Sequence, residues 1–154
     1  MVMEYVNFIK EITMRNRIET FIPKAIEYFL KNKNKFSNKD GSFNKVYNGY
    51  LASFGPSVIT AGLITTVAFY EGDKEKKKIN EAISAILSDE INEKIELIKF
   101  IRSDKFKNNE LYYKELILDI VISLKLAYRT FELKEAKWIF LFIFIKIKVM
   151  EKIF

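Results

Sequence analysis

The sequence contains neither cysteine nor histidine. The absence of cysteine excludes disulfide bonds, thiol nucleophiles and metal sites that depend on cysteine. The absence of histidine removes the commonest general base and the commonest zinc ligand. Familiar catalytic triads and zinc sites therefore cannot be assembled. The sequence predicts a protein that is not an enzyme and that uses no cofactor.

Glycine-rich phosphate-binding loops are also missing, since the chain has neither a P-loop nor a dinucleotide-binding loop. Carboxylate pairs such as Asp89 with Glu93 do occur. Acidic groups at helix starts are more often partners of the helix dipole than catalysts. A metal site made of carboxylates alone stays possible, but no acidic cluster stands out. A binding or assembly subunit is the favoured class.

Proline and glycine are scarce, with two and five residues among 154. An all-β fold needs many turns, so this scarcity argues against one. The hydrophobic content of 49% is normal for a globular protein, and the length allows one domain with its own core. We predict an all-α fold, a single compact bundle of five to seven helices over residues 1–154.

Long apolar runs are absent as well. The most apolar run, Trp138–Ile145, is far shorter than the roughly 20 residues that cross a bilayer. The N-terminus lacks the basic and apolar regions of a signal peptide. We therefore expect a cytoplasmic protein without a membrane partner.

Positive charge is in excess, with 26 lysine and arginine residues against 20 acidic ones and a net charge of +6. A moderately basic balance suits a nucleic-acid or acidic partner. A lysine-rich solvated surface gives the same composition. Composition alone does not separate these two interpretations.

One stretch, from Gly49 to Tyr70, has no charged residue. We expect Gly55-Pro56 to end a short helix that begins near Ser42 and to open a second helix. At helical spacing, small and bulky residues then lie on opposite faces. The small residues are Ser57, Ala61, Thr65 and Ala68, and the bulky ones are Ile59, Leu63, Val67 and Tyr70. We expect this helix to be buried on both sides, at the centre of the fold.

Apolar residues at three- and four-residue spacing predict further helices. They cover residues 2–29, as one helix or as two joined near Pro23, and also residues 79–87, 91–101 and 113–131. Asn32–Asn44 is expected to be a loop with almost nothing to bury. Residues 132–154 form an apolar C-terminal segment with two interpretations, because it could continue the preceding helix but residues 144–149 alternate like a strand. Its packing against the bundle is left open.

The segment YNGYLASFGPSVITAGLITTVAFYEG, residues 47–72, resembles the small subunit of type III-B CRISPR effector complexes, the Cmr family. That family has a Tyr-x-x-x-Phe-Gly or Leu-Pro step after an arginine-containing helix, and then a Gly-Leu pair in an apolar helix that ends in Ala-Phe. The matching residues are Arg17, Tyr50, Phe54-Gly55-Pro56, Gly62-Leu63 and Ala68-Phe69. The specific match covers about a sixth of the chain, and the C-terminal segment is more apolar than expected for the family.

The resemblance implies a helical, non-catalytic subunit whose copies stack with one another beside the subunits that form the backbone of the complex. A basic face would run along the guide RNA and target RNA and stabilise their pairing. Such binding is independent of sequence, because base pairing carries the specificity. Under this interpretation the RNA-binding residues are expected to be Arg15, Arg17, Lys24 and Lys45, followed by Lys74, Lys77 and Lys78.

Two other interpretations stay open. The chain could be a helical adaptor or oligomeric scaffold that contacts only proteins, with the apolar C-terminal segment as its interface. It could also be a peripheral membrane protein that uses Trp138–Phe154 as an amphipathic anchor. The apolar residues of that segment lie nearly all round the helix, which is unlike an interfacial anchor.

Overall fold

The computed structural model describes residues 1–153, and the side chains of all of these except residues 136–143. It is 77% helical, which confirms the predicted all-α class. The described helices are α1 (Val2–Lys31), α2 (Lys33–Phe36), α3 (Val46–Ala61), α4 (Leu63–Glu71), α5 (Lys77–Ile91), α6 (Leu97–Phe100), α7 (Asp104–Lys107), α8 (Glu110–Tyr128) and α9 (Ala136–Ile153). Two short strands, β1 (Phe43–Asn44) and β2 (Leu133–Lys134), pair in parallel.

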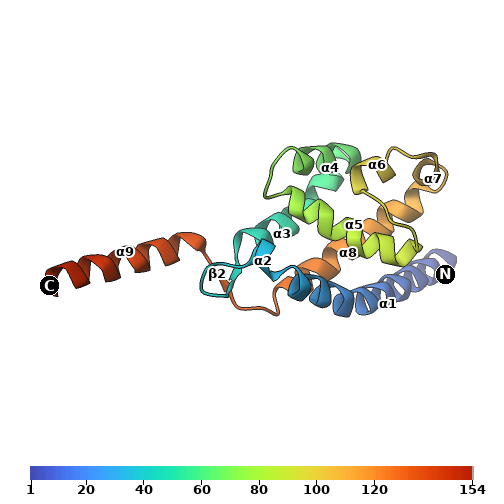
Figure 1. Ribbon diagram of the computed structural model, residues 1–154. Coiled ribbons are helices and arrows are strands. Elements are labelled where there is room, and N and C mark those ends of the chain that lie inside the picture. Colours follow the sequence, from blue (N-terminus) through green and yellow to red (C-terminus); the bar gives the residue numbers. More distant parts are fainter. Residues whose placement is uncertain (154) are drawn as a thin grey trace.

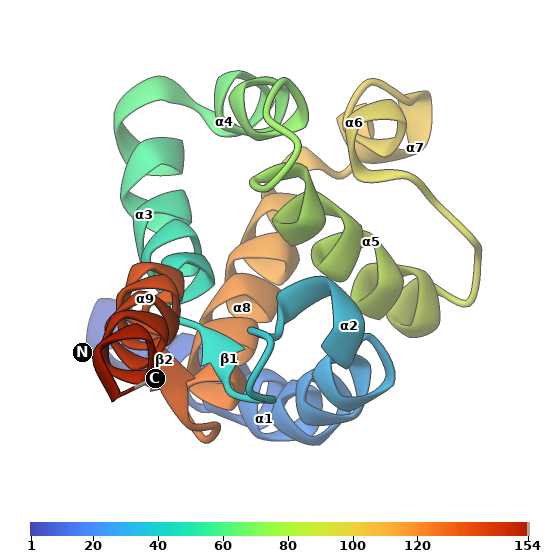
Figure 2. The same cartoon turned by 60° about the vertical axis from the view of Figure 1, so that its left-hand side comes forward.

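Helix α8 is the centre of the bundle, with α1, α3 and α5 packed around it (Figures 1 and 2). Its fully buried side chains include Leu116, Ile120 and Leu124. Helix α1 runs beside α8 in the same direction. Their contacts start where Arg17 reaches Asp119 and continue to Phe29, whose ring centroid lies 5.0 Å from that of Tyr128.

The expected central helix is instead a pair of helices at the side of α8. Pro56 does not end a helix but lies inside α3, on its exposed side. Proline has no N–H group to donate to the carbonyl of Ala52, and on the exposed side water can take that place. The break comes at Gly62, where φ is 92° and ψ is 161°. Glycine is the residue that adopts this conformation without steric cost. The predicted boundary is therefore wrong by about two turns.

The two faces of this stretch are also buried differently from the expectation. Leu63, Val67 and Tyr70 are buried as predicted, but the Ile59 side chain is 82% exposed. The small residues face solvent wholly or in part, as Ala61 does. The hydroxyl groups on this side bond to carbonyls one turn back along the helix, so they need no packing partner. A lack of charge therefore does not make both faces buried.

The predicted loop at residues 32–44 buries two large side chains, contrary to expectation. Phe36 lies on the short helix α2 and Phe43 on β1, and both rings contact the Tyr128 ring edge-on. Phe43 also stacks on Phe131 with ring centroids 4.2 Å apart. The segment is thus part of an aromatic core at the end of α8.

The remaining helices follow the predictions more closely. The helix predicted over residues 79–87 lies within α5, and its apolar residues Ile79, Ala82, Ile83, Ile86 and Leu87 are all buried. The prediction of one helix over residues 91–101 is wrong. Asn92 takes a left-handed conformation that ends α5, and only the short helix α6 forms in the second half of this range. Residues 144–149 belong to α9 and not to a strand.

Helix α9 extends away from the bundle (Figure 1). The expectation that Trp138–Phe154 is an interface or an anchor includes residues that cannot be assessed. The side chain of Trp138 and the whole of Phe154 lie outside the described part of the chain. Within residues 1–153, no helix combines the length and apolar character needed to cross a bilayer.

Candidate nucleic-acid interface

The seven cations predicted to bind RNA fall into two groups in the structure. Arg17, Lys24, Lys77 and Lys78 form ion pairs within the chain. The other three, Arg15, Lys45 and Lys74, are exposed. The first group therefore has structural roles that the sequence pattern did not reveal, and the second group presents its charge to solvent.

Arg17 joins the two parallel helices α1 and α8. Its guanidinium lies 2.8 Å from the carboxylate of Asp119, whose side chain is only 5% exposed. Burial raises the pKa of Asp119, and the adjacent Arg17 charge opposes that rise. Arg17 thus compensates a buried carboxylate, which is a role in folding.

Lys24 connects α1 to the end of α5. Its ammonium nitrogen lies 2.6 Å from Asp89 and 3.9 Å from Glu90. The hydrogen bond to Asp89 raises the pKa of Lys24 above its ordinary value. Asp89, which was expected to be a partner of the helix dipole, is instead paired with this lysine.

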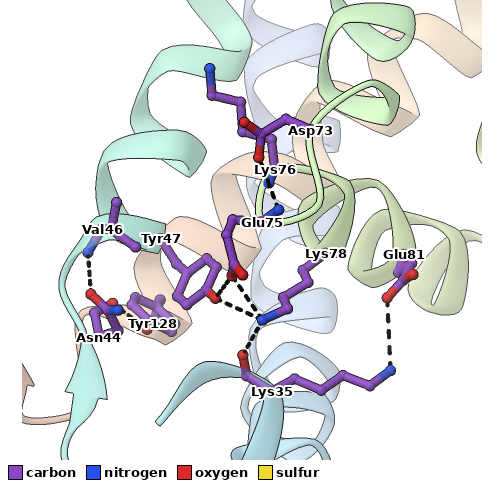
Figure 3. Close-up of polar contacts among 10 residues, drawn as sticks. All are labelled: Lys35, Asn44, Val46, Tyr47, Asp73, Glu75, Lys76, Lys78, Glu81 and Tyr128. Carbon is purple, nitrogen blue, oxygen red and sulfur yellow. Dashed lines mark hydrogen bonds and ion pairs between the residues drawn. The ribbon is translucent and has the colours of Figure 1, made fainter. Parts of the chain in front are cut away.

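Lys78 occupies the centre of a polar network between α2, α3 and α5 (Figure 3). Its ammonium donates to Glu75 at 2.8 Å, to the Tyr47 hydroxyl at 2.9 Å and to the Lys35 carbonyl at 2.9 Å. The Tyr47 hydroxyl in turn donates to Glu75. These hydrogen bonds lower the pKa of Glu75, the one from Lys78 most strongly. Lys78 is therefore a structural residue.

The positive charge at the start of α5 does not require an external anion. Asp73 accepts hydrogen bonds from the backbone N–H groups of Glu75 and Lys76, as an N-terminal cap does. Glu71 lies 3.3 Å from the Lys77 ammonium. Three carboxylates, including Glu75, thus offset the lysine run that by itself would oppose the helix dipole.

Lys76, which was not among the predicted RNA-binding residues, lies over two aromatic rings. Its ammonium is 4.3 Å from the centroid of Phe69, whose side chain is 63% exposed, and 5.5 Å from that of Tyr50. These are cation–π distances. The sequence signal that could have found Lys76 is an exposed phenylalanine one helical turn before the lysine run.

Lys45 extends this surface on the other side of Tyr50. Both residues line a cleft of ≈ 780 Å³ together with Gly49, Ser53 and Glu75. Lys74 is exposed next to Glu75 and contributes to its charge environment. We call Lys45, Tyr50, Phe69, Lys74 and Lys76 the lysine–aromatic surface.

Arg15 does not belong to this surface. It lies in α1 about 21 Å along the helix axis from Phe29, which packs near the start of α3 through Tyr128. Lys45 lines the cleft with Tyr50 and Glu75, Lys74 is next to Glu75 in the sequence, and Arg15 lies apart from both.

The lysine–aromatic surface combines two kinds of group that can contact a nucleic acid. Ammonium groups attract phosphates, and exposed rings offer stacking faces to bases. Glu75 and Glu135 also line the cleft, so its wall is not uniformly basic. Among the described residues, no group of three or more acidic side chains is placed to hold a metal ion.

A family model described as "CRISPR-associated protein (Cas_Cmr5)" matches residues 23–125. The matched part runs from Pro23 in α1 to Lys125 in α8, and it includes α3, α4 and α5 with most of the bundle core. Comparison with curated proteins and with solved structures gives no match.

Proposed function

Because the chain belongs to the Cas_Cmr5 family and is a small subunit of the type III-B (Cmr) CRISPR complex, we propose that it binds the backbone of the guide RNA and target RNA. Membership in the family makes it part of a multi-subunit effector complex. In our proposal its contribution to antiviral defence is to hold the paired RNAs in place, while cleavage belongs to other subunits.

The lysine–aromatic surface is the observation that carries this proposal. Lys45 and Lys74 are exposed, and Lys76 lies over the rings of Tyr50 and Phe69. Lysine ammonium groups would contact phosphates, and the ring of Phe69 would stack on a base or ribose that lies next to them. Contacts to phosphates and to the faces of bases carry no base sequence, so sequence selection would rest with the guide RNA.

The missing residue types support a non-catalytic role. The sequence has no histidine and no cysteine, and the buried carboxyl group of Asp119 is engaged by Arg17 inside the bundle. Burial raises the pKa values of Tyr70 and Tyr128, and both hydroxyls donate to backbone carbonyls. These groups are used for folding, and none of them faces the proposed RNA path.

The proposal includes further partners. Copies of the chain would stack with one another and would lie against the backbone subunits of the complex, in the cytoplasm. The exposed small-residue side of α3 and α4, which includes Ala61 and Thr65, would allow close approach of a neighbouring helix.

Binding of the isolated chain to RNA tests the proposal. Fluorescence anisotropy with a labelled single-stranded RNA and a labelled guide–target duplex would compare the wild type with the triple variant Lys45→Ala, Lys74→Ala, Lys76→Ala. We expect the triple variant to bind at least tenfold more weakly. The matched control removes three other exposed lysines, Lys10, Lys94 and Lys107. Equal loss in both variants would overturn the proposed site, and no binding by the wild type would overturn RNA binding by the isolated chain.

A second candidate function is an adaptor that contacts only proteins. Large apolar side chains stand exposed on α1 and α9, for example Tyr5 and Ile153. Exposed apolar surface of this kind marks protein interaction sites. An adaptor would assemble with its neighbours in the presence of nuclease and at high salt, whereas assembly through RNA would fail under both conditions.

A further inference from the structure

Two lysines of the lysine–aromatic surface alternate with acidic residues along the chain. The order is Asp73, Lys74, Glu75, Lys76, so two positive charges stand beside two negative ones. A lysine that pairs with a neighbouring carboxylate has less charge to offer to a phosphate. The attraction of this segment for RNA therefore depends on where the two carboxylates are directed.

The carboxylate of Asp73 is directed toward the backbone. It accepts hydrogen bonds from the N–H groups of Glu75 and Lys76, at 2.9 Å and 3.0 Å. These bonds cap the turn that leads into α5. The acidic group that precedes Lys74 is thus engaged by backbone donors.

The carboxylate of Glu75 is directed toward a buried network by two side-chain donors. Its Oε2 atom accepts a hydrogen bond from the Lys78 ammonium at 2.8 Å and another from the Tyr47 hydroxyl (Figure 3). Tyr47 is only 3% exposed, whereas the Glu75 side chain is 45% exposed. The carboxylate therefore lies at the boundary between the network and the solvent.

Lysines on the solvent side are close enough to compete for this carboxylate. In the described part of the chain, Glu75 forms its ion pair with Lys78, and none with Lys74 or Lys76. The hydrogen bonds from Lys78 and Tyr47 lower the pKa of Glu75, and the charge of the exposed Lys74 also contributes. A Glu75 carboxylate with fewer buried donors would thus find a lysine partner next to it.

We propose that Tyr47 is a positioning residue of the RNA surface, because its hydroxyl holds the Glu75 carboxylate away from Lys74 and Lys76 and leaves their charge available to phosphates. The inference rests on the proposed RNA function and adds a residue that does not itself touch RNA. The ring of Tyr47 packs edge-on against Phe36, with centroids 5.0 Å apart. Removal of the hydroxyl alone keeps this packing and weakens the hold on Glu75.

A double-mutant cycle with labelled single-stranded RNA tests this role. Tyr47→Phe should lower the affinity for RNA by about threefold or more, because the released carboxylate neutralises a neighbouring lysine. The slope of log K against log salt concentration should fall by about 0.7, the contribution of one phosphate contact. In a Glu75→Gln background, Tyr47→Phe should leave the affinity unchanged, because no carboxylate is left to release.

Tyr70→Phe is the matched control. It also removes the hydroxyl of a buried tyrosine, but that hydroxyl donates to the Tyr50 carbonyl and holds no carboxylate. The control should bind RNA like the wild type. Circular dichroism and urea unfolding check that every variant is folded under the conditions of the binding assay.

Carbon-13 NMR of the Glu75 carboxyl group follows the same contact without RNA. The hydrogen bonds from Lys78 and Tyr47 lower the pKa of this group, so its titration midpoint should be higher in Tyr47→Phe than in the wild type. An unchanged midpoint, an unchanged RNA affinity of Tyr47→Phe, or an equal loss of affinity in both backgrounds overturns the inference and leaves RNA binding in place. A wild type that binds no RNA overturns the proposed function instead, and the midpoint still decides whether Tyr47 holds Glu75.

Discussion

The guanidinium of Arg17 lies 2.8 Å from the carboxylate of Asp119 and joins α1 to α8. Asp119 is almost fully buried, and Arg17 is only 21% exposed. A buried carboxylate without its cationic partner keeps the full cost of lost hydration. The arginine in the motif that resembles the Cmr family therefore contributes to the stability of the bundle.

We expect Arg17→Ala to lower the free energy of unfolding by about 2 kcal/mol, less than for a fully buried pair because Arg17 is partly hydrated. Urea denaturation at neutral pH measures this change. Arg15→Ala, at an exposed position of the same helix, should change stability by less than about 0.5 kcal/mol. Unchanged stability together with weaker RNA binding in Arg17→Ala would assign Arg17 to the RNA.

The loss of unfolding free energy caused by Arg17→Ala should become smaller as pH falls. Burial already raises the pKa of Asp119 in the wild type, and removal of the opposing Arg17 charge raises it further. Since the folded-state pKa lies above the unfolded value, the cost of the ionised carboxyl group is present at high pH and is relieved as pH falls through the folded pKa. A difference in unfolding free energy that does not change with pH would contradict this account.

The salt dependence of RNA binding provides a second measure of the lysine–aromatic surface. For single-stranded RNA, each phosphate that a lysine neutralises adds about 0.7 to the slope of log K against log salt concentration. Removal of Lys45, Lys74 and Lys76 should therefore reduce the slope by about 2. A lower affinity with an unchanged slope would show that these lysines act through the fold.

Glu75 should make the bundle sensitive to acid. Hydrogen bonds from Lys78 and Tyr47 lower the pKa of Glu75 below its ordinary value of 4.5. A lowered folded-state pKa gives stabilisation that is complete above the ordinary value and is lost as pH falls through the folded pKa. Between about pH 6 and about pH 3, the wild type should lose more unfolding free energy than Glu75→Gln. Glu4→Gln, at an exposed site, serves as the control.

Gly62 should resist substitution although its surroundings are open. An added Cβ would meet nothing within 4 Å, but φ is 92° and ψ is 161°. The expected destabilisation of Gly62→Ala, about 1–3 kcal/mol, is therefore a backbone cost. Gly49→Ala, inside α3 with equally open surroundings, should instead stabilise by about 0.5–1 kcal/mol. Thermal or chemical unfolding of both variants tests this contrast in sign.

Local pattern predicted the helical class well, because burial on one side of a helix leaves a periodic trace in the sequence. The buried set of α5, such as Ile83 and Leu87, followed from spacing alone. Helix boundaries were harder to predict. Pro56 is tolerated on an exposed helix face and Gly62 supplies the break, and sequence alone does not show which face is exposed.

The candidate site was predicted only in part because ion pairs join residues far apart in the sequence. No local pattern links Arg17 to Asp119 or Lys24 to Asp89. The positive charges of Arg17 and Lys24 were therefore expected to be free to contact RNA. The contact of Lys76 with Tyr50 joins distant segments in the same way, whereas its closer ring partner, Phe69, lies nearby in the sequence. Helix periodicity shows which residues are buried but does not show which charges meet.

The parallel pairing of α1 and α8 also determines when the chain can fold. Helix α1 is synthesised before α8, yet one of the rings that pack on Phe29 is that of Tyr128, about 100 positions later. Contacts between such distant segments form slowly, since a long loop must close first. On the ribosome, the part of α1 that packs on α8 therefore stays uncovered until α8 has emerged. The bundle then closes late, when β2 can reach β1.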